Sequence, residues 1–216
     1  MAIVRPKEAY HERATKEMEK HLLTPKRNLR QKMAVACRIL ADEGHESALA
    51  GQITARGENP GTYWMLSFGL GFDEAQARNI VLCDDDLNLL EGDGMVNPSN
   101  RFHLWIYRHR PQVNAIIHTH PPYISALSLL GEKLVAAHMD TSMFYDDCAF
   151  LPEWPGPPIG DEEGKLIHEA LGTTAPSCSP ITGNCALAAR SKRLPFCRSS
   201  LSAPHACSCS RVRSGR

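Results

Sequence analysis

Residues 173–216 contain no aspartate or glutamate, although the whole chain has 24 acidic residues. Residues 1–172 therefore carry all 24 of them against 17 Lys and Arg, whereas the last segment carries 7 Lys and Arg. Five of the eight cysteines also lie in that segment. A Ser-, Arg- and Cys-rich stretch without acids cannot readily continue a packed core. We predict one folded domain over residues 1–172 and a disordered tail over residues 173–216.

Long apolar runs are missing as well. No stretch approaches the roughly 18 apolar residues of a membrane-spanning helix, and residues 1–8 lack the apolar core of a signal peptide. Cys37, Cys83 and Cys148 are far apart and match no zinc-finger spacing. They are typical of reduced cytosolic cysteines. These absences predict a cytoplasmic protein with no membrane partner.

The hydrophobic pattern of residues 1–172 predicts helices around a mostly antiparallel set of strands. Residues 7–43 are typical of two packing helices broken at Pro25, and Gly44 suits the end of the second. From residue 50 onward, short alternating segments between turn residues predict a β-meander. The predicted strands are 51–56, 62–68, 80–83, 89–92, 114–120 and 134–137, and the later predicted helices are 101–110, 123–130 and 161–171.

Two histidines end the strand predicted over residues 114–120, just before a double proline. Residues two apart in a strand point to the same face, so His118 and His120 aim together while Thr119 faces away. Imidazole is the commonest metal ligand in proteins, and two can share a divalent ion about 2 Å from each nitrogen. The alternative is a pair of surface histidines, which the apolar run over residues 113–117 disfavours.

A series of short motifs resembles the class II aldolase and adducin family over residues 28–172. The motifs are Gly-Gln-Ile-Thr-Ala-Arg (51–56), Gly92, Arg-Phe-His (101–103), Arg-Pro (110–111) and His-Thr-His-Pro (118–121). The last of these carries most of the resemblance. The order and spacing of the motifs indicate the family, and they say much less about the reaction.

The resemblance implies an α/β fold, a three-layer α/β/α sandwich around a mostly antiparallel central sheet, in a homo-oligomer that is commonly a tetramer. Enzymes of the family hold a divalent metal, Zn²⁺ or Mn²⁺, with three histidines. His118 and His120 match two of these, and the third follows in an Asn-His-Gly or His-His-Gly segment. The metal stabilises the enediolate or carbanion left when a C–C bond breaks. The implied substrate is a small carbonyl compound or carboxylic acid, cleaved by a lyase.

The sequence departs from the sugar-phosphate aldolases of this family. Those enzymes carry an acid–base glutamate four residues before the helix histidine, where this chain has Ser99 before His103. Their Ser-Gly-Asn phosphate loop is replaced by Ala-Gly-Gln at 50–52. These changes argue against a phospho-aldolase. Aromatic-acid decarboxylases of the family do not need that glutamate, and adducin-like domains assemble without chemistry.

The third histidine is expected about 60 residues after His120, where residues 173–183 contain none. Codons compatible with residues 173–184, read with the last base of a Gly172 codon, give Asp-Asp-Arg-Ala-Ile-Leu-Leu-Ala-Asn-His-Gly-Gln. A frameshift after Gly172 would thus place the lost histidine at Thr182. The alternative is a genuine basic tail that binds nucleic acid. We favour the frameshift and expect no nucleic-acid partner.

Several other residues are weaker candidates. His103 is either a satisfied helix histidine beneath the site or a pocket residue, and Tyr145 is a proton donor or a core aromatic. His138 could line the pocket at the end of the 134–137 strand, whereas His168 is expected on a helix surface. Arg56 is expected to support the fold. Three hypotheses remain: a metal-dependent lyase, an adducin-like assembly domain, and an inactive product of a shifted reading frame.

Overall fold

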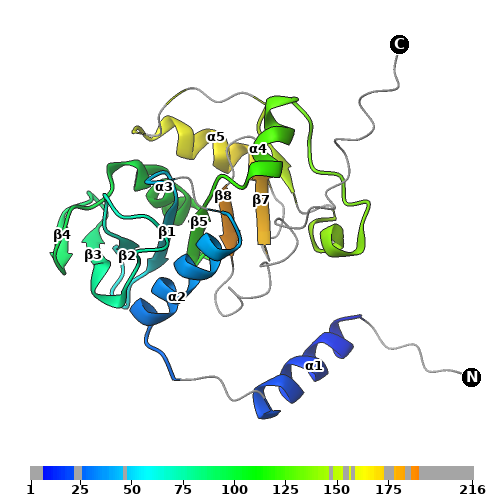
Figure 1. The fold of residues 1–216 in the computed structure, drawn as a ribbon, viewed down its shortest axis with the longest axis horizontal. Helices are drawn as coiled ribbons and strands as arrows, with labels where there is room; N and C mark the ends of the chain where they lie inside the picture. Colours follow the sequence, from blue (N-terminus) through cyan, green and yellow to red (C-terminus); the bar gives the residue numbers. More distant parts are fainter. Residues whose placement is uncertain are drawn as a thin grey trace, which may run out of the picture.

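The computed structural model describes residues 7–21, 26–45, 48–145, 148–152, 156, 159–172, 178–182 and 186–189 (Figure 1). The α-helices are α1 Lys7–His21, α2 Leu29–Asp42, α3 Arg101–His109, α4 Pro122–Leu129 and α5 Glu162–Leu171. The 3₁₀ helices are η1 Ala77–Asn79, η2 Pro98–Asn100 and η3 Met139–Phe144. The strands are β1 Gln52–Arg56, β2 Thr62–Leu66, β3 Ile80–Asp84, β4 Leu89–Glu91, β5 Ala115–His118, β6 Ala149–Phe150, β7 Cys178–Thr182 and β8 Ala186–Ala189.

The described strands form one sheet in the order β4-β3-β2-β1-β5-β8-β7-β6. Every pairing is antiparallel except that of β6 with β7. Helix α2 covers one face of the sheet, and α3 and α5 cover the other (Figure 1). The predicted α/β/α sandwich around a mostly antiparallel sheet is confirmed.

Helix α2 forms because its start is capped and one of its faces is apolar. Asn28 accepts a hydrogen bond from the Gln31 backbone N–H, and the Gln31 side chain accepts one from the Asn28 N–H, which makes a capping box. Met33 and Cys37 are buried against Ile53 of β1. Strand β1 alternates, so its apolar residues face α2 and its polar residues face α3.

The polar side of β1 faces α3, and Arg56 on this side hydrogen-bonds to several backbone carbonyls. The Arg56 guanidinium donates to the backbone carbonyls of Val113 at 2.7 Å, Tyr107 at 2.6 Å and Arg110 at 3.3 Å. It also lies over the Tyr107 ring, 4.8 Å from the centroid. Arg56 therefore ties β1 to the end of α3 and to the turn before β5, which confirms the prediction that it supports the fold.

Helices α3 and α5 pack closely because α5 offers a glycine at their contact. A Cβ atom at Gly164 would lie 2.4 Å from the Cβ atom of Trp105, so only glycine fits there. Arg110, which follows α3, holds the other end of α5. Its guanidinium donates to the carbonyls of His168 and Gly172 and to Nδ1 of His168. These carbonyls are among those that the end of a helix leaves without helical partners.

Three predictions about the elements are wrong. Residues 134–137 form no strand, and the exposed Val135 shows that this apolar segment does not enter the sheet. Residues 178–182 and 186–189 do form strands, although the local sequence predicts none. The described side chains of α1 are all exposed, and α1 lies apart from the sheet in Figure 1, because its surface is polar and carries ion pairs such as Lys16–Glu12. The boundary at residue 172 stays a prediction.

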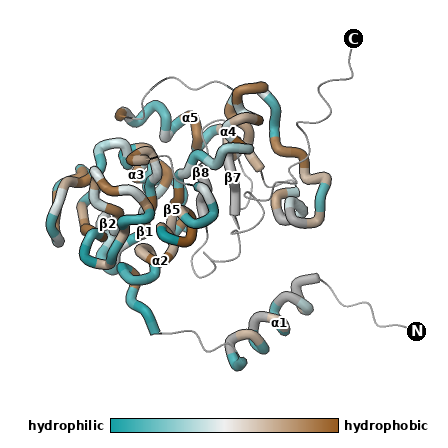
Figure 2. The backbone as a smooth tube through the Cα atoms, in the orientation of Figure 1, coloured by the Kyte–Doolittle hydropathy of each residue, from teal (hydrophilic) through white to brown (hydrophobic). Residues whose placement is uncertain are grey.

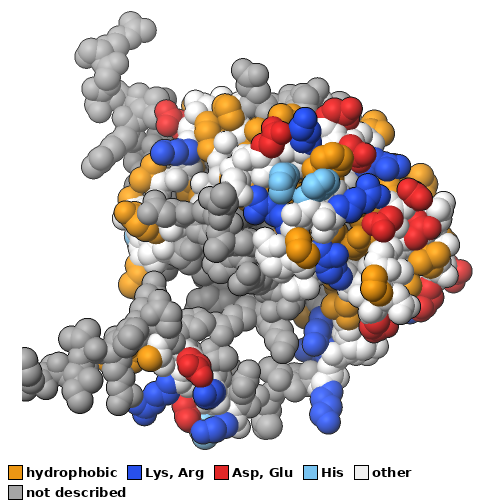
Figure 3. All heavy atoms as spheres, turned by 180° about the vertical axis from the view of Figure 1, so that it is seen from behind, with side chains coloured by type: hydrophobic (Ala, Val, Ile, Leu, Met, Phe, Trp, Pro, Cys, Tyr) orange, Lys and Arg blue, Asp and Glu red, His pale blue; other side chains and the backbone are white. Residues whose placement is uncertain are grey.

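The surface of the described part is chemically mixed. Acidic and basic side chains are interspersed on the face shown in Figure 3. Figure 2 shows hydrophobic backbone stretches in the sheet and also around α4. Leu129 and Met139, in and after α4, are 89% and 83% exposed. No helix among the described residues is long and apolar enough to cross a membrane.

Candidate metal centre

The two predicted histidines lie together at the end of β5. Strand β5 is fully buried, and Pro121 and Pro122 then turn the chain into α4. The Nε2 atoms of His118 and His120 are 2.8 Å apart, and their rings cross at 84°. His118 is buried and His120 is half-buried. The strand alternation therefore brings both side chains to one point, as predicted.

This donor pair fits a divalent metal. Burial lowers the pKa of His120 and so favours the neutral imidazole, which is the form that binds metals. Two nitrogens bound tetrahedrally at about 2.0–2.1 Å lie roughly 3.3 Å apart, so a small opening of the pair would admit an ion. Within the part of the chain that the structure describes, no third His, Cys, Asp or Glu completes a cluster.

A buried hydrogen-bonded chain lies under the pair on the α3 side. Nδ1 of His103 is 2.8 Å from the Thr54 hydroxyl, which is 2.9 Å from the Tyr107 hydroxyl. His103 has no exposed surface. Burial, and after it the charge of His118, hold the pKa of His103 well below its ordinary value. His103 is therefore a neutral imidazole close to His118.

Gln52 of β1 lies directly beside His118, because these two residues pair across the strands and share the α3 face of the sheet. The Gln52 side chain is buried, and its Oε1 atom has no hydrogen-bond partner among the described residues. A buried amide oxygen without a partner is costly, and it is suited to a donor group brought by a ligand.

The opposite face of the same strand end is closed by His45, which follows α2. Its Nδ1 atom lies 3.3 Å from the Thr119 hydroxyl, and both side chains are buried. Thr119 thus faces away from the histidine pair, as the alternation predicts. This contact fixes the backbone between His118 and His120 from behind.

A family model for the Class II Aldolase and Adducin N-terminal domain matches residues 31–186. This match covers most of the chain. The chain belongs to the class II aldolase and adducin family. The match extends past the predicted domain boundary at residue 172 and includes β7 and Ala186, the first residue of β8.

Individual relatives of this class II aldolase/adducin chain include decarboxylases and an aldolase. The chain is 31% identical over 147 residues to "Decarboxylase NovR" of Streptomyces niveus, covering 66% of this chain and 54% of that protein. It is 36% identical over 109 residues to a 3,4-dihydroxyphthalate decarboxylase of Arthrobacter keyseri, covering 47% and 44%. The L-fuculose 1-phosphate aldolase of Glaciozyma antarctica superposes with a TM-score of 0.65 at 27% identity, covering 76% and 68%. The chain spans about half the length of the curated relatives it matches.

The other predicted site residues lie in different elements of the fold. Ser99 lies half-buried in η2, just before α3, and its backbone N–H donates to the Asn97 side chain. Tyr145 is 70% exposed and is not a core aromatic. His138 is exposed and ends no strand, so the expectation that it closes a strand by the pocket is wrong. His168 is half-buried on α5, beside Arg110.

The segment predicted to carry the third ligand is described only in part. Residues 173–177, 183–185 and 190–216 lie outside the described residues, and so do most of the frameshift predictions. The backbone of Thr182 ends β7, and β7 pairs with β8, whose Ala186 pairs with His118. Position 182 therefore lies at the same end of the sheet as the histidine pair, two strands away.

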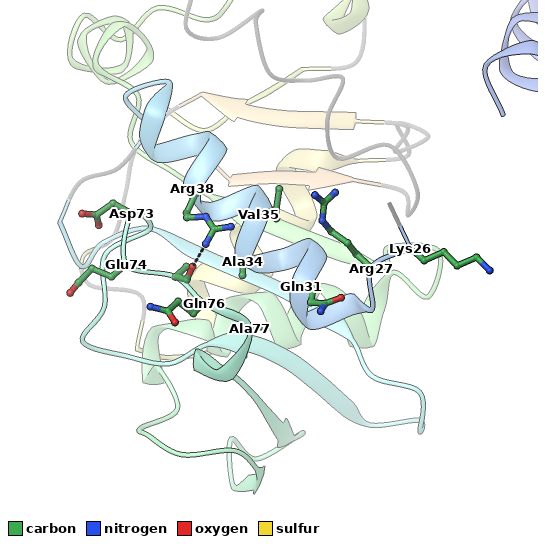
Figure 4. Close-up of a pocket in the computed structure, with 11 residues that line it drawn as sticks. Lys26, Arg27, Gln31, Ala34, Val35, Arg38, Asp73, Glu74, Gln76 and Ala77 are labelled. Atoms are coloured by element: carbon green, nitrogen blue, oxygen red, sulfur yellow. Dashed lines mark hydrogen bonds between the residues drawn. The ribbon is translucent and has the colours of Figure 1, made fainter. Parts of the chain in front are cut away.

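A separate cavity of about 590 Å³ lies on the α2 side, and no predicted site residue lines it. Figure 4 shows Arg27 and Arg38 on one side and Asp73 and Glu74 on the other. The Arg38 guanidinium donates to the Ala75 carbonyl. The cavity thus lies between α2 and residues 73–77, away from the histidine pair's side of the sheet, which α3 covers.

Sequence reasoning missed Gln52, Thr54 and His45 as neighbours of the pair. A signal for the first two was present. Polar residues alternate with Ile53 and Ala55 in a strand that is otherwise buried, so a polar face had to meet other polar groups. No pattern pointed to His45, because its contact with Thr119 joins residues far apart in the sequence.

Proposed function

We propose that this class II aldolase/adducin chain is a metal-dependent lyase that breaks a C–C bond in a small carboxylic acid. The observation that carries the proposal is the convergence of His118 and His120, with Nε2 atoms 2.8 Å apart at a strand end. Decarboxylation is preferred to aldol cleavage. Ser99 stands where phospho-aldolases of the family carry a glutamate, and two of the relatives, one at 31% and one at 36% identity, are named as decarboxylases.

Nε2 of His118 and Nε2 of His120 would hold a divalent ion, Zn²⁺ or Mn²⁺, since imidazoles accept either. When bound, such an ion supplies a Lewis acid that stabilises negative charge on a substrate oxygen as the C–C bond breaks. The residues of the chain would bind and orient the substrate. The partnerless Oε1 atom of Gln52 would accept a hydrogen bond from a substrate hydroxyl next to the His118 ring.

Decarboxylation moves an electron pair as well as a proton. The bond to the carboxylate breaks, CO₂ leaves, and the electron pair stays on the substrate carbon, which then takes a proton. Ser99 cannot supply that proton as an acid, because a serine hydroxyl does not ionise near neutral pH. Tyr145 is a candidate proton donor, and its 70% exposure gives solvent access to the proton.

The complete site requires a third ligand, and we propose that it is lost in this chain by the frameshift after Gly172. The sheet register supports position 182 as the place, since it lies at the same end of the sheet as His118. The lack of a third ligating side chain among the described residues favours one other candidate, an inactive form of the enzyme. We also propose a cytoplasmic homo-oligomer, a tetramer as is common in the family.

The experiment compares this chain with a version whose reading frame is restored from codon 173. Both are loaded with one equivalent of Zn²⁺ or Mn²⁺ and given hydroxylated benzoic and phthalic acids, and CO₂ release is measured. The restored chain should release CO₂, and its His118→Ala variant should not. His109→Ala, on the surface end of α3, is the matched control and should retain activity. Equal activity in the His118→Ala variant would contradict the proposal, and a restored chain that binds no metal would favour the adducin-like alternative.

A further inference from the structure

His103, Thr54 and Tyr107 form a buried polar chain that the proposed reaction does not itself use. The two contacts are 2.8 Å between His103 Nδ1 and the Thr54 hydroxyl and 2.9 Å between the two hydroxyls. Burial raises the pKa of Tyr107, so its hydroxyl keeps its proton. Three polar groups in one core are costly unless each is satisfied. This cost suggests that the chain serves the neighbouring site.

One end of the chain is not satisfied. Nε2 of His103 is buried and has no hydrogen-bond partner among the described residues. Burying such an atom without a partner lowers the folding equilibrium constant by roughly 10-fold or more, which corresponds to a penalty of about 1–3 kcal/mol. Aromatic packing holds the ring in place: His103 meets Phe102 edge to face at 4.3 Å between centroids. The orphan nitrogen is therefore a fixed feature of the core.

His118 is the neighbour whose charge acts on the His103 ring. The Phe102 ring also meets the His118 ring edge to face, at 5.4 Å between centroids. Thr54 pairs with Ile116 across the strands, one step along the same face of the sheet from the pairing of Gln52 with His118. Nε2 of His118 faces His120, and Nδ1 of His118, at the other side of the ring, is buried.

We infer that His103 is a positioning residue for His118: its Nε2 atom accepts a hydrogen bond from Nδ1–H of His118 when Nε2 of His118 binds a divalent metal. This inference rests on the proposed function. A histidine that binds a metal through one nitrogen carries its proton on the other and donates it to a neighbouring acceptor. The acceptor sets the tautomer and the orientation of the ligand ring.

The hydrogen-bonded hydroxyls of Thr54 and Tyr107 allow His103 to change tautomer in either direction. In the metal-free site the Tyr107 hydroxyl donates to Thr54 and the Thr54 hydroxyl donates to Nδ1 of His103, so His103 carries its proton on Nε2. In the metal-bound site His103 carries its proton on Nδ1 and donates it to Thr54, whose hydroxyl turns toward Tyr107. The number of protons is unchanged, because His118 moves its proton from Nε2 to Nδ1 and His103 does the same. Metal binding at His118 thus switches the tautomer of His103.

The test is ¹⁵N NMR of the histidine rings in this chain during titration with Zn²⁺ alone. We expect the His103 signals to change from the Nε2–H to the Nδ1–H pattern as those of His118 and His120 shift. His103→Leu and Thr54→Val should each weaken Zn²⁺ binding, His103→Leu by about 10–100-fold. His103→Gln, whose amide can accept and donate, should restore most of the affinity. His109→Gln, on the exposed side of α3, is the control and should change nothing.

The outcomes separate this inference from the proposed function. Zn²⁺ shifts at His118 and His120 without a change at His103 would overturn the inference and leave the metal site standing. If Zn²⁺ shifts no histidine signal, the metal proposal fails for this chain. The pairing of His103 with His118 is then tested by the spectra of the metal-free protein. A changed His118 tautomer in His103→Leu then supports the pairing. An unchanged one overturns it, since a purely structural histidine would not set the tautomer of His118.

Discussion

The two halves of the sheet meet at β5 and differ in how their sequences explain them. From β3 to β5 the strands are rich in buried apolar residues, which pack against α2 on one face and against α3 and α5 on the other. On the other side of β5, β8 is Ala-Leu-Ala-Ala, and β7 contains Pro180, which has no N–H for a strand ladder. The backbone of β8 and β7 continues the sheet, but the described residues of these two strands include no histidine. His118 and His120 belong to the first half alone.

This contrast teaches that fold and chemistry can be lost separately. The pairing of β5 with β8 needs only extended backbone, so residues of many kinds can form it. A metal ligand needs one side chain at one position, and in our proposal Thr182 occupies that position. The same contrast explains why the chain is readily assigned to its family and yet lacks a complete site among its described residues.

The largest expected effect concerns the pair itself. In the chain with its frame restored from codon 173, His120→Ala should weaken Zn²⁺ binding by 100-fold or more, because it removes one of three ligands. A competition titration with a zinc-sensitive dye measures this. His109→Ala should bind Zn²⁺ as the unchanged chain does. A His120→Ala variant with full affinity would show that the first half of the sheet does not hold the metal.

The next effect concerns the contact that fastens α5 to the first half of the sheet. Arg110→Met should lower the free energy of unfolding by about 2 kcal/mol, because it removes charge-assisted hydrogen bonds to the carbonyls at the end of α5. Urea denaturation gives the value. Arg108→Met is the control and should cost about 1 kcal/mol or less, since its ion pair and its hydrogen bond with Asp85 both lie at the surface.

Close packing of α3 on α5 gives an effect of similar or slightly smaller size. Gly164→Ala should destabilise the protein by about 1–3 kcal/mol, because the new methyl group meets Trp105. Gly131→Ala is not a suitable control, since Gly131 has a positive φ. Trp105→Leu in the same protein should recover part of the loss by making room. An undiminished unfolding midpoint in Gly164→Ala would show that α5 packs on α3 differently.

A smaller effect follows from the lowered pKa of His103. Above the ordinary histidine pKa of about 6.5 the ring is neutral in both the folded and the unfolded chain. Below it the unfolded chain takes up a proton that the folded chain does not, so stability falls by up to about 1.4 kcal/mol per pH unit. Urea denaturation between pH 7.5 and pH 5 should show a shallower fall for His103→Gln. Identical slopes would place the proton uptake at other groups.

Much of the first half was predictable from the sequence, for physical reasons. The strand that ends in His118 and the shared face of His120 follow from the side-chain period of two, and α3 and α5 follow from their apolar spacing. The contacts around the pair were not predictable in the same way. The His45–Thr119 contact spans 74 residues, and the apolar segment at 134–137 offers no pattern that distinguishes a strand from an exposed stretch.

The second half was not predictable because its residue types do not favour the strands that its backbone forms. Ser, Pro and Thr in β7 predict turns, yet the strands β8 and β6 flank and pair with it. Local propensity is a weak guide when neighbouring strands supply the hydrogen bonds. Ser99 lies in η2, which Asn97 caps and Pro98 begins, and its role depends on the substrate.

The most direct test of the central claim is the zinc content of the two forms of the chain after dialysis against trace metal. The account predicts one tightly bound Zn²⁺ per chain when the frame is restored from codon 173, and at least 100-fold weaker binding in the chain as it stands. Equal zinc content in the two forms, or none in either, would contradict the claim that His118 and His120 are two parts of a three-histidine site.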